Sequence, residues 1–102
     1  PGSGTSDPYC VCEVPGKRKS SFATPVVENS SSPVWEHEGE IENFTPHDTL
    51  VLTVWDQDFG KPDDLLGRAA LPSSLVLPTG FEGEVPLADT GGAHSFLTVK
   101  VV

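Results

Sequence analysis

The chain has 102 residues, 36% of them apolar and 21% charged, which suits a single globular domain and excludes a disordered tail. Its formal charge of −9 argues against nucleic acid as a partner and disfavours unaided binding to an anionic membrane. Bound divalent cations would weaken the membrane argument because they add positive charge. No apolar run reaches the roughly 18 residues that span a bilayer, and no signal-peptide pattern opens the chain.

Seven short strands are predicted, separated by turn residues, and no helical period is long enough for three turns. In chain order the strands cover residues 9–14, 22–28, 37–44, 49–55, 66–71, 82–87 and 95–101. The strand at 49–55 is apolar on both faces and should be central, whereas the strand at 37–44 has a row of glutamates on one face and should be half exposed. Residues 72–77 hint at a short helix. The pattern predicts an all-β antiparallel sandwich or barrel formed by residues 1–102 as one domain.

Cys10 and Cys12 are the only cysteines. Residues two apart on a strand share a face and lie about 6.6 Å apart, which is awkward for a disulfide. We therefore expect buried or half-exposed free thiols, which mildly favours a reducing compartment.

Four aspartates crowd the nine residues that follow the central strand: Asp56, Asp58, Asp63 and Asp64. Carboxylates packed this closely repel one another, and Ca²⁺ is the simplest compensation because it accepts six to eight oxygen ligands at about 2.3–2.6 Å. Asp56 and Asp58 should point the same way where the strand ends, and a turn containing glycine and proline lets Asp64 return toward them. The alternative is a solvated acidic loop without a ligand.

Several segments, taken in order, resemble the C2 domain family, the calcium- and phospholipid-binding β-sandwiches of synaptotagmins and conventional protein kinases C. Gly4 to Tyr9 is similar to the end of the family's first calcium loop. Residues 24–29 and 32–36 are similar to the family's second-loop signature. Residues 50–58 and 64–67 are similar to its third calcium loop and the glycine beyond that loop. Residues 81–87 and 96–101 resemble its closing strands. Ser32 stands where the family usually has asparagine. The resemblance implies a C2-like β-sandwich.

The same resemblance implies four carboxylate ligands for Ca²⁺, at Asp7, Asp56, Asp58 and Asp64. The backbone carbonyl of Gln57 is a further candidate, and Asp63 is expected to face solvent. The family has one more aspartate early in its first loop, which by spacing would fall at or just before Pro1, so this chain does not show it. Its absence would mean one fewer ion or weaker binding.

The resemblance also leaves a strand unaccounted for. The family has eight strands, and the apolar strand that precedes its first calcium loop has no counterpart before Pro1. Residues 96–102 are similar to that opening strand as well as to a closing one. Three explanations are open: a trimmed chain, one unit of a tandem array, or a last strand that fills the place of the first.

Two features bear on membranes. Phe59 lies within the third calcium loop, where it would either enter the lipid interface or pack against its own loop. Lys17, Arg18 and Lys19 lie in the turn after the first strand, near a lysine-rich patch that some family members use for acidic phosphoinositides; the alternative is a solvated hairpin turn. The implied role is calcium-dependent binding of anionic phospholipid membranes by a monomeric module of a larger protein, cytoplasmic and peripheral to the membrane when calcium is bound.

Other functional classes fit less well. Counted from Asp56, the sixth and twelfth positions of an EF-hand loop are Lys61 and Gly67, where that motif needs glycine and an acid. Residues 88–91 resemble the aspartic-protease triplet but are also an ordinary turn, and the three histidines are too scattered for a metal site, so no enzyme is expected. The alternative function is a calcium-independent module that binds another protein.

Overall fold

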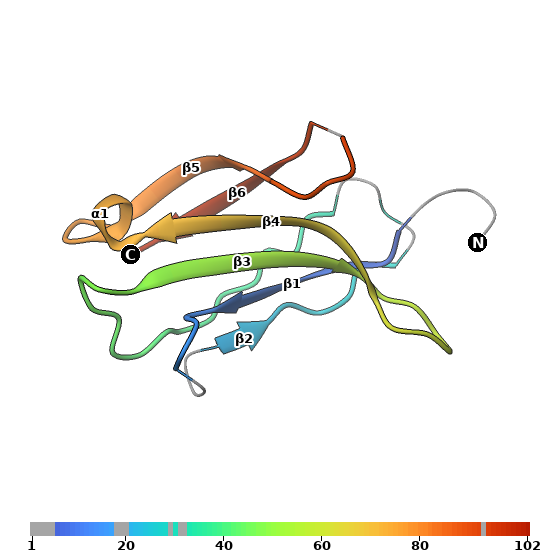
Figure 1. Cartoon of the computed structure of the whole chain (residues 1–102), viewed down its shortest axis with the longest axis horizontal. Helices are drawn as coiled ribbons and strands as arrows, with labels where there is room; N and C mark the ends of the chain where they lie inside the picture. The colour runs from blue at the N-terminus through green and yellow to red at the C-terminus, as the bar shows by residue number, and fades with distance from the viewer. Residues whose placement is uncertain (1–5, 18–20, 29, 31–32, 93) are drawn as a thin grey trace.

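The computed structural model describes residues 6–17, 21–28, 30, 33–92 and 94–102. Within these residues the chain forms six strands and one short helix (Figure 1). The elements are β1 (Pro8–Glu13), β2 (Ser21–Ala23), β3 (Thr49–Asp56), β4 (Asp64–Pro72), α1 (Ser73–Val76), β5 (Phe81–Pro86) and β6 (Phe96–Val101). All strand pairs are antiparallel, which confirms the predicted all-β class.

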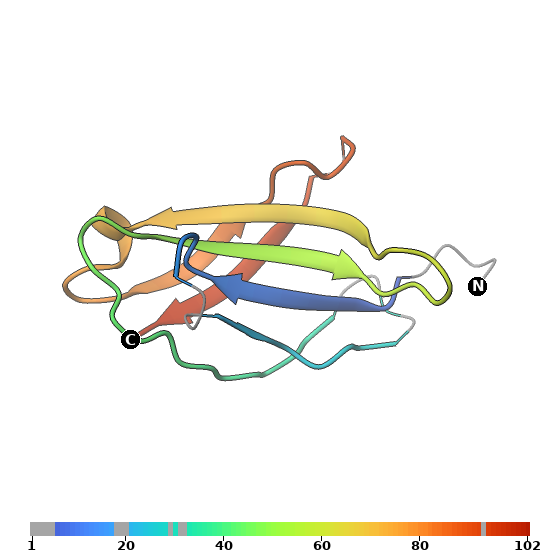
Figure 2. The same cartoon turned by 60° about the horizontal axis from the view of Figure 1, so that its bottom comes forward.

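The strands form two layers, and Figure 2 shows the β5-β6 hairpin passing behind the larger sheet. One layer is a four-stranded sheet in the order β2-β1-β3-β4, and the other is the β5-β6 hairpin. The apolar strand β3 is paired on both sides, so its predicted central position is confirmed. A bridge between Arg68 of β4 and Ala88 joins the layers at one edge. Gly67 permits this approach, because a Cβ there would lie 3.0 Å from the side chain of Leu87.

Alternating side chains of the two layers meet in one core. Its ten buried members are Cys10, Cys12, Val14, Leu50, Leu52, Val54, Ala69, Leu71, Val76 and Val85. Strands β1, β3 and β4 of the larger sheet therefore present alternate residues to the inside, as the period of a half-buried strand requires. Leu71 is the most enclosed of these side chains, with 1% of its surface exposed.

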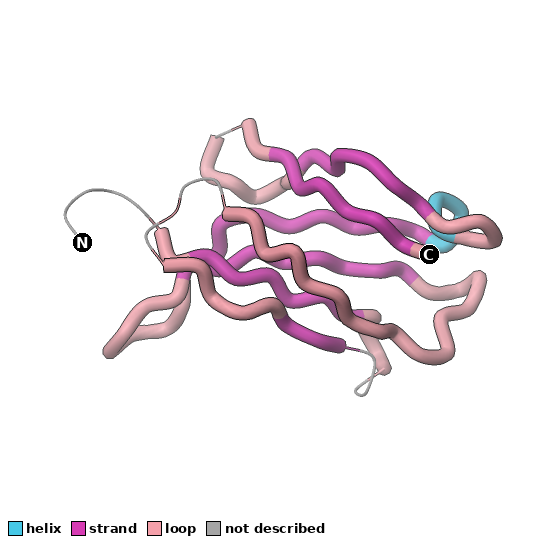
Figure 3. Tube along the Cα trace, turned by 180° about the vertical axis from the view of Figure 1, so that it is seen from behind, coloured by secondary structure: helices cyan, strands magenta, loops and turns pink. Residues whose placement is uncertain are grey.

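One predicted strand is shorter than expected, and another is absent from the structure. The strand expected at 22–28 shortens to Ser21–Ala23, and residues 37–44 form no strand, so the described chain has six strands rather than seven. Figure 3 shows residues 33–44 as a loop-coloured segment that runs lengthwise along the molecule. Its backbone joins no ladder, and without a hydrogen-bonded neighbour an alternating sequence cannot be a strand.

The structure describes both cysteines and the C-terminal strand, which the sequence analysis had discussed. Cys10 and Cys12 are free and buried, as expected, and burial raises the pKa of the first to about 11 and of the second to about 12. β6 pairs with β5 along its whole length. It therefore has a closing position beside β5, and the three explanations for the missing opening strand stay predictions.

No helix among the described residues is long and apolar enough to cross a membrane. The short helix hinted at by residues 72–77 is present as α1, and its Val76 is buried in the core.

Candidate metal centre

The hairpin of β3 and β4 brings three aspartates together. Asp56 is the last residue of β3 and Asp64 the first of β4, and the two are register partners. Asp58 lies in the turn between them. One carboxylate oxygen from each of the three lies within 4.8 Å of the others. Three negative charges at this spacing are unfavourable unless a cation or a proton compensates them.

Asp58 carries the clearest sign of a missing partner. Its Oδ2 is buried and accepts no hydrogen bond from any described residue. Desolvation raises the pKa of this carboxyl above its ordinary value, the charges of Asp64 and Asp56 add to the increase, and Lys61 opposes it. Buried polar atoms are nearly always satisfied, so an oxygen of this kind points to a ligand that completes the site. The carboxylate set and its buried oxygen fit a hard divalent cation.

Lys61 already places a positive charge beside this cluster, which the sequence analysis did not anticipate. Its Nζ lies 3.8 Å from Asp58 Oδ2 and 3.7 Å from Asp64 Oδ2. The sequence did offer a signal for this contact, because Lys61 lies three residues after Asp58 and three residues before Asp64. The lysine side chain is 61% exposed, so these ion pairs are weak and the ammonium group can leave without much loss.

Asp7 contacts the cluster through its backbone. Its N–H donates to Asp56 Oδ1 at 2.9 Å, and its carbonyl accepts from the N–H of Gln57 at 3.0 Å. These bonds tie the start of β1 to the end of β3 and orient the Asp56 carboxylate. The Asp7 carboxylate is outside the group of three that converge within 4.8 Å. Its role as a ligand stays a prediction.

Asp63 does not face solvent, so that expectation is wrong. Its Oδ1 accepts from the N–H of Asp58 at 3.0 Å, and its Oδ2 accepts from the hydroxyl of Tyr9. The hydrogen bond from the Asp58 N–H lowers the pKa of Asp63 most, and the bond from the Tyr9 hydroxyl lowers it further. The bond between Tyr9 and Asp63 in turn raises the pKa of Tyr9 to about 12. Asp63 therefore braces the loop against β1 and holds Asp58 in place. A pairing 54 residues apart leaves no local pattern in the sequence.

The loop beyond β3 presents an aromatic side chain to the outside. Phe59 is 87% exposed, which excludes the alternative that it packs against its own loop. Gly60 follows with φ of +84°, a conformation that glycine adopts without strain and that turns the chain back toward β4. Figure 1 shows this loop protruding at one end of the molecule.

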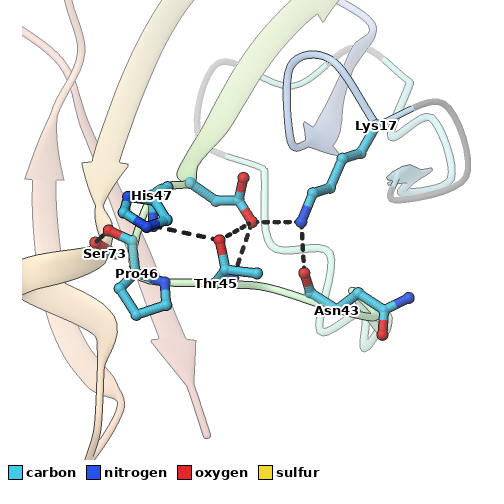
Figure 4. Close-up of polar contacts among 7 residues, drawn as sticks. Lys17, Asn43, Thr45, Pro46, His47 and Ser73 are labelled. Carbon is cyan, nitrogen blue, oxygen red and sulfur yellow. Dashed lines mark hydrogen bonds and ion pairs between the residues drawn. The ribbon is translucent and has the colours of Figure 1, made fainter.

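Lys17 lies beyond the opposite end of β1, where it is already engaged. Its Nζ contacts Asp48 Oδ2 and donates to the carbonyl of Asn43, both at 2.6 Å, and Thr45 donates to the same Asp48 oxygen (Figure 4). The contact with Lys17 lowers the pKa of Asp48 most, and the hydrogen bond from the Thr45 N–H lowers it further. Arg18 and Lys19 are outside the described residues. The structure thus does not bring Lys17 and the aspartate cluster together.

Comparison with known proteins assigns the fold to a family. The family model named "C2 domain" matches residues 1–87. The chain belongs to the C2 domain family. Among curated relatives, mouse extended synaptotagmin-1 is 40% identical over 82 residues and yeast tricalbin-1 33% identical over 87 residues. These alignments cover 79% and 83% of this chain but only 7% of each relative, so the chain spans a small part of these relatives' length.

A solved structure agrees on the fold. A C2 domain of plant Extended Synaptotagmin 1 superposes with a TM-score of 0.77 at 18% identity, covering 94% of this chain and 74% of that one. C2 domains of the synaptotagmin type support membrane and lipid binding in general. The family is a binding module rather than a catalytic one, although mouse cytosolic phospholipase A2 delta, an enzyme, is 30% identical over 79 residues.

Proposed function

We propose that this domain binds Ca²⁺ between Asp56, Asp58 and Asp64 and, in that state, binds anionic phospholipid membranes. The buried Asp58 Oδ2, which accepts no hydrogen bond from the described residues, is the observation that carries the proposal, because it lies in a group of carboxylates already gathered within 4.8 Å. Asp7 is proposed as a fourth ligand and the Gln57 carbonyl as a further one. Both residues are connected by the backbone bonds that link β1 to β3.

The proposed mechanism is electrostatic. In the calcium-free chain, with its formal charge of −9, the cluster presents negative charge that an anionic bilayer repels. The bound ion supplies positive charge that lipid phosphates can share. Lys61 is then released from Asp58 and Asp64, and its ammonium group becomes available to the headgroups. Phe59, exposed in the same loop, contributes apolar area at the interface.

The basic turn is proposed to contribute separately. Lys17 would contact acidic headgroups only through a surface at the other end of β1, and Arg18 and Lys19, which follow it in the sequence, are proposed to assist it. Lys17 would first have to give up its contacts with Asp48 and Asn43, which makes it the weaker of the two lipid contacts. We further propose that the domain has no catalytic role and serves as a cytoplasmic module of a larger protein, peripheral to the membrane when calcium is bound.

Asp58→Asn tests the proposal, with Asp89→Asn as the matched control. Asp89 is exposed and has φ of +58°, a conformation that asparagine tolerates, so the control removes one charge without strain. We expect calorimetry to show calcium affinity reduced at least about tenfold in Asp58→Asn, since ligand charge sets affinity in such sites, and unchanged in Asp89→Asn. Sedimentation with phosphatidylserine vesicles should lose its calcium dependence in the first variant only.

The alternative is a calcium-independent module that binds another protein. Absence of heat on titration of the wild-type domain with calcium up to millimolar concentrations would favour that alternative. Vesicle binding that survives Asp58→Asn unchanged would also contradict the bridging mechanism.

A further inference from the structure

Tyr9 of β1 contacts the β3-β4 loop although it is not one of the three aspartates that converge there. Its backbone lies in the ladder of the larger sheet, where its register partner is Trp55, and its side chain is half-buried. The hydroxyl at the end of that side chain donates to Asp63 Oδ2. Tyr9 therefore connects the sheet to the loop that carries the candidate metal centre.

Asp63 extends this connection to the backbone of Asp58. Its Oδ1 accepts from the Asp58 N–H at 3.0 Å, while its Oδ2 accepts from the Tyr9 hydroxyl. Both oxygens of Asp63 thus have donors, and its carboxylate lies outside the group of three within 4.8 Å. Asp58, by contrast, has the buried Oδ2 that accepts no hydrogen bond from the described residues. Tyr9 and Asp63 together restrain the residue on which the candidate site depends most.

The loop needs such a restraint because the ladder beside it is irregular. The pairing of β3 with β4 shifts register between Val54 and Trp55, directly before Asp56. An irregularity of this kind disrupts the ladder locally and bends the strand. Gly60, with φ of +84°, adds backbone freedom at the turn. A loop of this kind loses conformational entropy when it gathers carboxylates around an ion.

We propose that Tyr9 is a positioning residue of the calcium site, which acts through Asp63 to hold Asp58 in place for the ion. Because it concerns the affinity of the same three aspartates, this role rests on the proposed function. A restraint that exists before the ion arrives lowers the entropy that binding costs. Groups that orient metal ligands from outside the coordination shell typically change metal affinity by about 10–100-fold when they are removed.

Tyr9 provides this restraint without adding charge. Lys61 also contacts the loop, but its ammonium group lies beside Asp58 and Asp64 and competes with an incoming cation. The neutral hydroxyl of Tyr9 holds Asp63 and leaves the negative charge around the site intact, which favours a divalent cation. Tyr9→Phe therefore changes position without changing charge.

Tyr9→Phe in the 102-residue chain is the test, measured by calorimetric titration with calcium chloride in the absence of lipid. We expect calcium affinity to fall by about five- to tenfold. In the calcium-free chain, the amide of Asp58 should exchange with solvent about threefold faster or more, because its acceptor Asp63 is no longer held. Thr24→Val is the matched control, since Thr24 Oγ1 accepts from the Cys10 N–H at 2.9 Å, a hydroxyl contact with β1 that does not involve the loop. It should change neither quantity.

A second background shows whether Tyr9 acts through Asp63. Asp63→Ala removes the acceptor of both hydrogen bonds and should itself weaken calcium binding. Adding Tyr9→Phe to Asp63→Ala should cause no further loss, since residues that act as one unit are not additive. Asp63→Asn keeps an oxygen for the Asp58 N–H and should retain more affinity than Asp63→Ala.

Unchanged or tighter calcium binding by Tyr9→Phe would overturn the positioning role alone. An equal loss in Thr24→Val, or a further loss when Tyr9→Phe is added to Asp63→Ala, would overturn it as well. A wild-type chain that takes up no calcium would overturn both this role and the proposed function. Urea unfolding of the calcium-free variants checks that each is folded under the conditions of the titration.

Discussion

Asp58 and Lys61 form the point at which a cation would compete with a side chain of the protein. The lysine ammonium lies within 3.8 Å of both Asp58 and Asp64, close enough to compensate the cluster but mostly exposed to water. Such exposed pairs contribute at most about 1 kcal/mol. Lys61 therefore reduces the repulsion among the three carboxylates when no ion is bound, and it weakens calcium binding only slightly.

Replacing Lys61 with glutamine should tighten calcium binding by about two- to fivefold, because the ion no longer displaces an exposed ion pair. Lys100→Gln on β6 is the control, since it removes the same charge from a site outside the cluster. Isothermal titration measures both. Weaker calcium binding in Lys61→Gln than in Lys100→Gln would show that the lysine is not a competitor.

The pair of Lys17 and Asp48 predicts a pH dependence of stability. The pKa of Asp48 is lowered in the folded state, so its contribution is present above the unfolded value of about 4 and is lost as the pH falls through the folded value. In Lys17→Met, unfolding should occur at lower urea concentration than in the wild type at about pH 7, and the difference should shrink below about pH 4. A difference that stays constant across this range of pH would contradict this account.

At the scale of the elements, the core lies between the larger sheet and the β5-β6 hairpin. Leu71, at the end of β4, is 1% exposed, and Leu75 of α1 is 51% exposed. Leu71→Ala should lower the free energy of unfolding by about 2–5 kcal/mol through lost burial and a residual cavity. Leu75→Ala should change it by less than about 0.5 kcal/mol. Urea unfolding of both variants is the measurement, and equal losses would mean that the two layers do not pack as described.

Strands with strong local patterns could be predicted from the sequence. β3 is apolar on both faces, and its central place followed from that alone. Residues 37–44 alternate just as clearly but form no strand, because a strand also needs a neighbour, and sequence pattern does not reveal whether one is there.

The same limit applied to the candidate site. The convergence of Asp56, Asp58 and Asp64 was visible because their spacing is local to one hairpin. Asp63 was misjudged because its partner Tyr9 lies on β1, far away in sequence. Lys61 was overlooked although its spacing was local, since a lysine in an acidic turn is usually solvated.

For the whole molecule, the proposed membrane contact lies at one end. Phe59 and Asp58 lie in the β3-β4 loop with Asp56 and Asp64 at its two ends, whereas α1 lies at the other end of the molecule (Figure 1). Because the net charge is −9, the proposed approach to an anionic bilayer would depend mainly on this loop, and the basic turn would add a weaker contact.

Phe59→Ala should weaken calcium-dependent vesicle binding by about tenfold or more, because full burial of such a side chain is worth about 1.5–3 kcal/mol. Calcium affinity in the absence of lipid should not change. Leu75→Ala, an exposed apolar residue on α1, is the control and should leave vesicle binding unaltered. Equal vesicle binding by wild type and Phe59→Ala would place the lipid contact elsewhere on the surface.

A crystal structure of the domain grown with calcium would show directly whether the three aspartates bind an ion. We expect one ion with carboxylate oxygens of Asp56, Asp58 and Asp64 at about 2.3–2.6 Å, and Lys61 turned away into solvent. Millimolar calcium that leaves Lys61 beside Asp58 and Asp64, with only water between the carboxylates, would contradict it.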